Sequence, residues 1–157
     1  MIDENQAIEA YIDTPKTVDF YKKAFSQYTI SGIEKFSWQW SWWAMFGGMF
    51  YLLYRKLYLE AFAYFLIFAI IGMIPVAGLI LWILSGAVLP FLVYKRYKRI
   101  KAQVEENIPN ESEQLNVLRE LGGVNKWAIW VAVAVHAFLW TGILYTVIMI
   151  AGMPPMH

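Results

Sequence analysis

The sequence contains no cysteine, which excludes disulfides, thiolate zinc sites, iron–sulfur clusters and a cysteine nucleophile, and leaves the redox compartment open. Charge is also scarce, since charged residues make up 16% of the 157 residues and hydrophobic residues 59%. A typical soluble domain has about 25% charged and about 45–50% apolar residues, so this composition disfavours a soluble enzyme. The formal net charge of +1 predicts no bulk affinity for nucleic acid.

Two long stretches lack Asp, Glu, Lys and Arg altogether. The first covers 34 residues, 61–94, and the second covers 31 residues, 127–157. A membrane-spanning helix needs about 20 largely apolar residues, with a usable range of about 17–25. The first stretch therefore has room for two spans and the second for one.

The first stretch divides at Pro75, which cannot continue a helix and has glycines on both sides that permit a sharp reversal. The sequence predicts a tight transmembrane hairpin of two helices, 57–73 and 75–94. It predicts a third span at 127–152, which is long enough to tilt in the bilayer.

A further uncharged run, residues 36–54, has the length of a span at 19 residues, but its composition is unusual for one. It holds four tryptophans, and Gly47-Gly48 interrupt it. Tryptophan prefers the headgroup level, and each glycine weakens a helix interior by about 1 kcal/mol relative to alanine. We therefore expect an interfacial or re-entrant helical hairpin here, with a fourth span as the alternative.

The positions of the 13 lysines and arginines favour the non-crossing alternative. Four lie before residue 36, two are Arg55 and Lys56, and seven lie between residues 95 and 126. If residues 36–54 do not cross the bilayer, all of them lie on one side, as the positive-inside rule favours. The N-terminus is then cytoplasmic and the C-terminus lies across the membrane. The first 35 residues show no signal-peptide pattern, so we expect the internal spans to direct insertion.

Two segments outside the spans have the pattern of amphipathic helices. In the first, Thr14-Pro15 predicts a helix start, and the apolar residues that follow at helical spacing are Phe20, Ala24, Phe25 and Tyr28. Such a helix binds a membrane surface or a partner, or packs against the protein's own cytoplasmic elements, and both alternatives stay open. In the second, one helical face carries Leu115, Leu118 and Leu121 before Gly122-Gly123 ends the helix.

The basic run YKRYKRIK, residues 94–101, is expected to extend the second span as a helix until Ile108-Pro109 ends it. Basic clusters at this place serve as topology signals. They also bind anionic lipid headgroups, at about 1 kcal/mol per charge near the surface. No nucleic-acid-binding motif surrounds the cluster.

The stretch FSWQWSWWAMFGGMFYLLYRKLY, residues 36–58, resembles the hallmark of a bacterial inner-membrane family of unknown function, DUF 2628, in which an aromatic run ends in Tyr-Arg-Lys-x-Tyr. The stretch LRELGGVNKW, residues 118–127, is similar to that family's Gly-Gly entry into its last span. The resemblance covers about two thirds of the chain, from Phe36 onward. Here a second glycine, Gly48, replaces the family's proline, and a bend is still expected. The resemblance implies a small integral protein of the bacterial inner membrane with no assigned activity. Together with the charge positions it makes the expected protein multi-pass, with its C-terminus in the periplasm.

Three polar residues fall within or at the ends of the expected spans: His136, Ser85 and Glu60. His136 and Ser85 each lie 9 residues from the cytoplasmic end of their span, about 14 Å deep at 1.5 Å per residue. An interhelical hydrogen bond between them is the favoured interpretation. The remote alternative is the serine–histidine dyad of an intramembrane hydrolase, although Ser85 lacks a Gly-x-Ser-Gly context. Glu60 is expected to pair with Arg55 or Lys56.

The sequence thus predicts an all-α integral membrane protein with three transmembrane helices, a Trp-rich interfacial or re-entrant hairpin and cytoplasmic amphipathic helices. The expected segments are an N-terminal amphipathic segment (1–35), the Trp-rich element (36–56), the transmembrane hairpin (57–94), a basic loop with short helices (95–126), the third span (127–152) and a tail (153–157).

The expected function is non-enzymatic, namely organising lipid or a partner at the cytoplasmic face. The expected partners are the bilayer, anionic phospholipids, and a protein partner or second copy of the chain; no metal, cofactor or nucleic acid is expected. The residues expected to carry this function are Trp38, Trp40, Trp42, Trp43, Arg55, Lys56, Lys95, Arg96, Lys98 and Arg99. The alternative is a small transporter or channel subunit with a polar groove lined by His136, Ser85, Thr141 and Tyr145.

Overall fold

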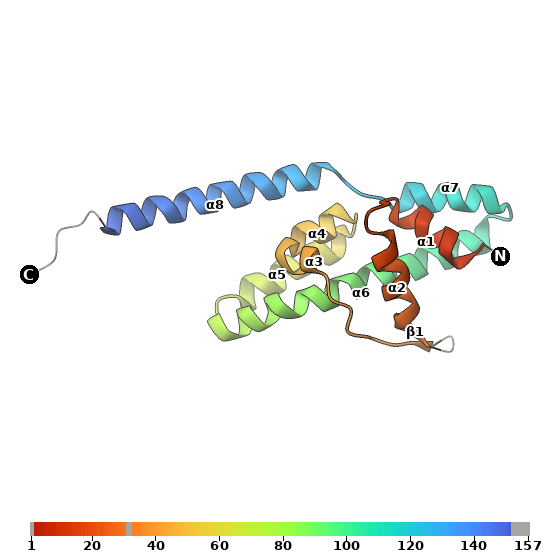
Figure 1. Cartoon of the computed structure of the whole chain (residues 1–157), viewed down its shortest axis with the longest axis horizontal. Helices are drawn as coiled ribbons and strands as arrows, with labels where there is room; N and C mark the ends of the chain where they lie inside the picture. Colours follow the sequence, from red (N-terminus) through yellow and green to blue (C-terminus); the bar gives the residue numbers. More distant parts are fainter. Residues whose placement is uncertain (1, 31–32, 152–157) are drawn as a thin grey trace, which may run out of the picture.

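The computed structural model describes residues 2–30 and 33–151 and shows a mainly helical, elongated molecule (Figure 1). Its described part holds eight helices and one antiparallel pair of two-residue strands. The helices are α1 (Glu4–Ile12), α2 (Val18–Tyr28), α3 (Trp42–Gly47), α4 (Met49–Tyr54), α5 (Tyr58–Ile71), α6 (Pro75–Asn107), α7 (Glu111–Leu121) and α8 (Trp127–Ala151). The strands are β1 (Thr29–Ile30) and β2 (Ile33–Glu34).

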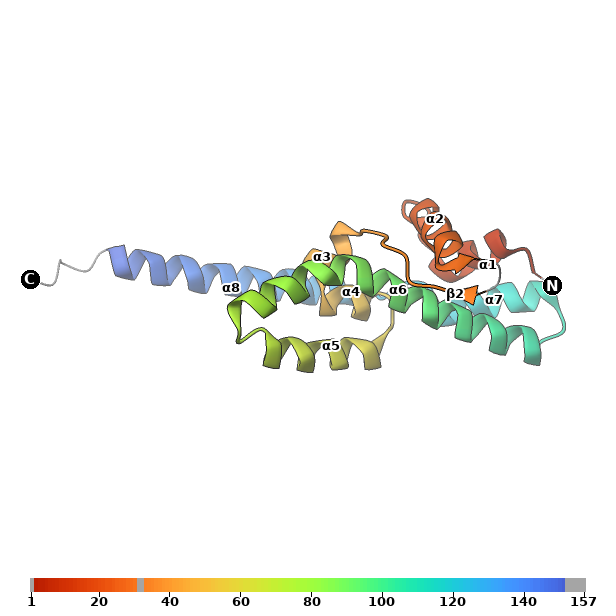
Figure 2. The ribbon, with the colours of Figure 1, turned by 90° about the horizontal axis from the view of Figure 1, so that it is seen from below.

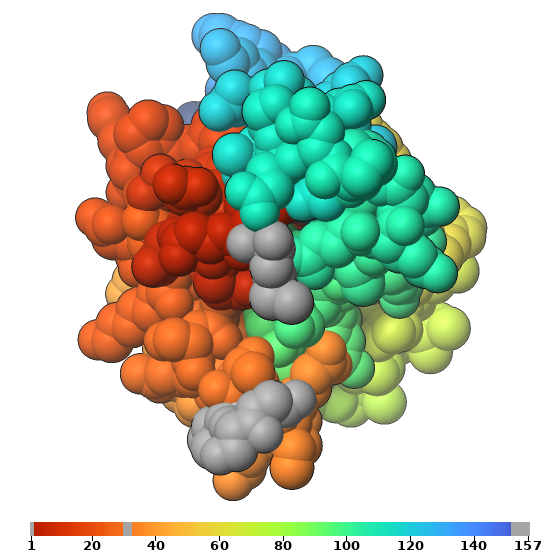
Figure 3. Space-filling model, turned by 90° about the vertical axis from the view of Figure 1, so that its right-hand side faces the viewer, coloured from red at the N-terminus to blue at the C-terminus, as the bar shows by residue number. Residues whose placement is uncertain are grey.

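One end of the molecule is a packed helical head, made of α1, α2, α7 and the C-terminal half of α6. Figure 3 looks onto this end and shows α1, in red, lying beside α6 and α7, both of which it contacts. Tyr11 of α1, Tyr97 of α6 and Leu118 of α7 are each at most 3% exposed. These residues belong to one core that continues into α4 and α5 through Tyr51, Leu52 and Ala61.

Helix α2 buries its apolar face inside this head. Tyr21, Ala24, Phe25 and Tyr28 are buried, and the ring of Phe25 stacks on Tyr97 with 5.2 Å between the ring centroids. The amphipathic pattern of this segment is thus satisfied by the protein's own α6. Of the two uses left open by the sequence, packing against the protein is the one that the structure shows.

The expected helix start at Thr14-Pro15 is wrong. Thr14 donates its hydroxyl hydrogen to the carbonyl oxygen of Ile12 at 2.9 Å, closing the C-terminal end of α1. Thr17 then donates its backbone N–H to the Thr14 carbonyl at 3.0 Å, which makes a turn. Helix α2 begins only at Val18, because Thr14 and Pro15 are used to reverse the chain between α1 and α2.

The expected hairpin is present as α5 and α6, which run antiparallel on either side of the turn at residues 72–74 (Figure 2). Helix α5 has only 14 residues, about 21 Å at 1.5 Å per residue, against about 30 Å of hydrocarbon. It is three residues shorter than the expected 57–73: one is lost at the start, after Lys56 with its left-handed φ of 61°, and two at the end, where the turn at residues 72–74 begins. Helix α6 continues from Pro75 to Asn107, as the basic run predicted.

Two helices, α6 and α8, are long and apolar enough to cross a membrane, and α5 belongs to a shorter class. Helix α8 matches the expected third span to within one residue, and its main packing partner is α4. Beyond that contact it extends alone, away from the head (Figure 1). The expected compact bundle of three helices is therefore not formed, and the expected tail, 153–157, lies outside the described residues.

The Trp-rich segment forms two six-residue helices, α3 and α4, instead of one continuous helix. Gly48 separates them with a φ of 48°, which side chains with a Cβ rarely adopt, so the bend expected at the paired glycines is present. Helix α3 packs on α6, where Ser41 donates its backbone N–H to the carbonyl oxygen of Gly86 at 2.9 Å. Helix α4 lies between α5 and α8.

Candidate functional site

The four tryptophans singled out by the sequence occupy two different environments. Trp38, Trp42 and Trp43 are exposed, Trp43 to 79%. Trp40 is half-buried, and its ring lies on Gly86, where a Cβ would meet it at 3.0 Å. Ring contacts join Trp38 to Trp40 and Trp40 to Trp42, with centroids 6.1 and 5.4 Å apart. Trp40 thus fixes the segment to α6, and the other three rings face outward.

Arg55 and Lys56 do not form the exposed cationic pair that the sequence predicted. Arg55 is 4% exposed and lies under α1 and α2. Its guanidinium donates to the carbonyl oxygen of Ile12 at 3.0 Å and to Oγ1 of Thr17 at 3.1 Å. It also lies over the ring of Tyr21, 4.7 Å from the centroid. The physical reason for its burial is that it closes the C-terminal end of α1, where carbonyl oxygens lack helical partners.

Lys56 and the basic run of α6 lie nearer the surface. Lys56 donates from Nζ to the backbone oxygen of Glu120 at 2.9 Å, which ties α4 to α7. Lys95 and Arg99 are exposed, whereas Arg96 and Lys98 are half-buried. The Nζ atom of Lys95 lies 5.2 Å from the ring centroid of Phe91. Most of the expected cationic surface is therefore present, with Arg55 removed from it.

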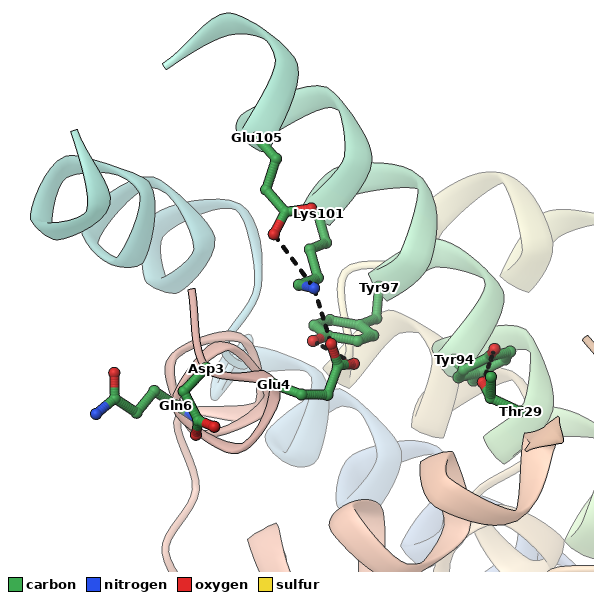
Figure 4. Close-up of polar contacts among 8 residues, drawn as sticks. All are labelled: Asp3, Glu4, Gln6, Thr29, Tyr94, Tyr97, Lys101 and Glu105. Atoms are coloured by element: carbon green, nitrogen blue, oxygen red, sulfur yellow. Dashed lines mark hydrogen bonds and ion pairs between the residues drawn. The ribbon is translucent and has the colours of Figure 1, made fainter. Parts of the chain in front are cut away.

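A partly buried ion pair that the sequence did not predict joins α1 and α6 (Figure 4). Lys101 binds the carboxylate of Glu4 at 2.8 Å and that of Glu105 at 3.3 Å. Tyr97 donates its hydroxyl hydrogen to Glu4 at 3.0 Å. The signal was the helical spacing of Lys101 and Glu105, but Glu4 lies 97 residues away in the chain, beyond the reach of any local pattern.

Burial also changes the acidity of tyrosines in the head. Desolvation raises the pKa of Tyr11 from 10.0 to about 12, although the nearby cations Arg96 and Arg55 oppose the shift. Desolvation likewise raises the pKa of Tyr28. These tyrosines stay neutral throughout the physiological range and serve the core, so they offer no general acid or base near pH 7.

Ser85 and His136 are not brought together, and the side-chain hydroxyl that lies near Ser85 is that of Tyr64 on α5. Ser85 donates its hydroxyl hydrogen to the carbonyl oxygen of Trp82 at 2.6 Å, and Nδ1 of His136 contacts the carbonyl oxygen of Ala132 at 2.7 Å. Each residue bonds its own helix, so the expected Ser85–His136 hydrogen bond is wrong. Glu60 makes no ion pair with Arg55 or Lys56 in the part of the chain that the structure describes, because Arg55 points into the head.

The polar groove expected for a transporter is also not formed by the described residues. On α8, Thr141 and Tyr145 are exposed, and Thr141 donates to the carbonyl oxygen of Ala137 at 2.8 Å. Ser85 lies buried on α6, and the main partner of α8 is α4. The arrangement thus provides no line of polar groups along the apolar helices.

A partly open cavity of about 770 Å³ lies between α2, α3, α4 and α8. Its walls are mostly apolar and aromatic, and two cations, Lys16 and Arg55, lie among its lining residues without any carboxylate. His136 lines it as well, with its ring centroid 5.9 Å from that of Phe50. Trp40 and Arg55, separated in sequence, thus meet at the same cavity.

Two side-chain donors that belong to cavity-lining residues have no partner. Nε1 of Trp40 and Nε of Arg55 are buried and make no hydrogen bond in the described structure. Buried donors of this kind normally find an acceptor, so the pair is unusual. Among the described residues no group of three or more His, Cys, Asp or Glu side chains could hold a metal ion.

The fold and the site together define a mainly helical protein with two helices fit to cross a membrane and a separate polar head. The chain belongs to the DUF2628 family, described as a protein of unknown function, whose family model matches residues 7–100. The match begins in α1, upstream of the aromatic run, and ends within α6, before LRELGGVNKW. No curated protein and no solved structure matches the chain significantly.

Proposed function

We propose that this is a non-enzymatic, multi-pass protein of the bacterial inner membrane whose head organises anionic lipid or a partner protein at the cytoplasmic face. The observation that carries the proposal is the segregation of charge from exposed apolar surface. Large apolar side chains are exposed along α5, the first half of α6 and α8. Glu60 is the only Asp, Glu, Lys or Arg within 58–94 and 127–151. Exposed apolar surface on this scale is typical of contact with lipid.

The proposed topology has three crossings. The apolar part of α6, residues 75–94, is about 30 Å long and so reaches across the hydrocarbon. The turn at its start, where Met73 is 83% exposed and Ile74 60%, then lies at the far side. Helix α5 together with its flanks must return over the same distance, at the lower limit of span length.

The exposed tryptophans and the basic run indicate which parts of the protein would lie at headgroup depth in this arrangement. Trp127 begins α8, and Trp42 and Trp43 are exposed on α3, which packs beside Gly86 of α6. Tryptophan rings are enriched at headgroup depth, and cations directly outside it attract anionic lipid. Lys95 and Arg99, both exposed on α6, are then placed to face phosphate groups.

The absence of cysteine allows a clean test of the topology, because single-cysteine variants can be labelled in intact cells with a membrane-impermeant maleimide against no background. We expect Lys23→Cys and Gln103→Cys to react only after the cells are opened, and Met73→Cys to react from outside. Labelling of Lys23→Cys in intact cells would refute the cytoplasmic head. If Met73→Cys is not labelled in intact cells but is labelled once the membrane is dissolved, the proposed crossing by α5 is refuted.

The lipid-organising role is tested with the double variant Lys95→Gln/Arg99→Gln in vesicles of phosphatidylcholine and phosphatidylglycerol. Each lost charge should remove about 1 kcal/mol, so local enrichment of a fluorescent phosphatidylglycerol around the protein should fall about tenfold or more. The control is Lys95→Arg, which keeps the charge and should keep the enrichment. Equal enrichment in all three proteins would contradict the role.

A further inference from the structure

We propose that the cavity between α2, α3, α4 and α8 is a binding site for a single anionic glycerophospholipid. Its phosphate would lie against Arg55 and Lys16, and an acyl chain would run along the aromatic wall toward α8. The inference rests on the proposed function, because it needs the cavity to lie at the membrane. It names a specific bound molecule, whereas the basic run of α6 attracts lipid in general.

The buried guanidinium of Arg55 is the first observation that points to an anion. It has five N–H donors, and the structure gives it two acceptors, the Ile12 carbonyl and the Thr17 hydroxyl, both neutral. No carboxylate lies within ion-pair distance of it among the described residues. A buried charge without a counter-ion is strongly unfavourable, so a bound anion would complete the site.

The second observation is the balance of charge around the cavity. Its lining holds Lys16, which is exposed, and Arg55, which is buried, with no Asp or Glu. The unpartnered Nε1 of Trp40 adds a neutral donor. Because all of these groups donate and none carries negative charge, an acceptor-rich anionic group such as a phosphate fits better than a cation.

The third observation is the apolar character of the rest of the wall. Phe46, Phe50 and Trp42 come from the Trp-rich segment, and Ala132 and Val133 come from α8. Val133 lines the cavity and is also 55% exposed, so the wall continues onto the outer surface of α8. A free phosphate would leave these walls uncovered, whereas a lipid chain covers them and continues into the bilayer.

The occupant is a membrane lipid instead of a segment of a second protein copy. The cavity is lined both by residues of the head, from Lys16 to Tyr21, and by the first turns of α8, from Ala128 to His136. Its volume of about 770 Å³ falls within the range of small-molecule sites. A lipid at this depth reaches the cavity by lateral diffusion, with its headgroup already at the level of Arg55.

The test is native mass spectrometry of the full-length protein purified in mild detergent, with dioleoyl phosphatidylglycerol or dioleoyl phosphatidylcholine added. We expect one phosphatidylglycerol per wild-type chain and preference for it over phosphatidylcholine. Arg55→Gln should lower the affinity for phosphatidylglycerol about tenfold or more, because a charge-assisted bond is lost, and Arg55→Lys should restore part of it.

A second pair of variants leaves the head untouched, in case Arg55→Gln fails to fold. Ala132→Trp fills the cavity from α8 and should abolish the single bound lipid. Ala137→Trp, the matched control, adds the same bulk to an exposed position of α8 that does not line the cavity, and should bind as wild type does.

Three results would overturn the site: Ala132→Trp binding phosphatidylglycerol as Ala137→Trp does, equal affinity for the two lipids, or retention only of a peptide or second chain. The proposed function fails separately. If cysteine labelling contradicts the topology while Ala132→Trp still loses a bound lipid, the lipid site stands and the membrane arrangement is wrong. If labelling agrees and no variant changes lipid binding, the arrangement stands and the site is wrong.

Discussion

Replacing Gly122 by alanine should loosen the head at the point where α7 meets α1. Gly122 is buried directly after α7, and a Cβ there would lie 2.2 Å from the backbone oxygen of Tyr11 and 2.7 Å from its Cδ2. A backbone oxygen cannot rotate away as a flexible side chain can, so the two helices must separate. The hydrogen bond from the Gly123 N–H to the same oxygen, 2.7 Å long, would be stretched.

The size of the effect follows from these two losses. Overpacking a well-filled interior costs about 1–3 kcal/mol. Losing a buried backbone hydrogen bond costs about 1 kcal/mol. The free energy of unfolding should therefore fall by about 2–4 kcal/mol, which for a chain of this size lowers Tm by roughly 4–16 °C.

The assay is thermal unfolding of the purified protein in mild detergent, followed by far-UV circular dichroism. The matched control is Gly142→Ala on α8, where an added Cβ meets nothing within 4 Å, and its Tm should stay at or slightly above that of wild type. Limited proteolysis should also cut Gly122→Ala earlier near α1. If Gly122→Ala has the same Tm as Gly142→Ala, α1 and α7 do not pack as described.

Two further predictions concern electrostatics in the head. Glu4→Gln weakens the salt bridge to the buried Lys101 and should lower the free energy of unfolding by about 1 kcal/mol. Glu9→Gln breaks an exposed pair with Lys22 and should lower it by less than about 0.5 kcal/mol. Comparable losses for the two variants in a denaturant titration would contradict this difference. Because burial raises the pKa of Tyr11 from 10.0 to about 12, the folded state holds this proton more tightly than the unfolded chain. The contribution of Tyr11 to the free energy of unfolding is fully present below pH 10 and is lost between pH 10 and 12. Tyr11→Phe should therefore reduce the loss of stability over this pH range by about 2–3 kcal/mol. An unchanged dependence of the free energy of unfolding on pH would refute this prediction.

The long helices were predictable because their signals are local. Pro75 begins α6 at the residue expected, and Trp127 begins α8 as the end of the charged loop indicated. Helix α1 was missed although its signals are present: Asp3 caps it by accepting from the Gln6 N–H at 3.1 Å, and Ile8 and Ile12 recur four residues apart on its buried face. A search for long apolar runs does not detect so short a helix, in which polar residues stand among the apolar ones.

The site was predictable only in its composition. The residue types were identified, but burial of Arg55 depends on where α1 ends, 43 residues earlier in the chain. The residue at which α5 begins depends likewise on the backbone of Lys56, whose left-handed conformation no hydropathy count detects. The burial of Arg55 and the start of α5 therefore follow from long-range packing and from a single unusual backbone dihedral, which sequence periodicity does not reveal.

The cavity depends on the paired glycines, because the bend at Gly48 separates α3 from α4. In one continuous helix Trp40 and Arg55 would lie 15 residues apart, about 22 Å at 1.5 Å per residue, and could not line the same small cavity. With the helix interrupted at Gly48, Trp40 lies against Gly86 of α6 just before α3 begins, and Arg55, directly after α4, bonds Thr17 at the start of α2. Trp42 and Trp43, although exposed, line the same cavity as the buried cation Arg55. A run of residues that has the length of a span is thereby converted into an aromatic wall and a positively charged floor, which is the combination that an anionic lipid requires.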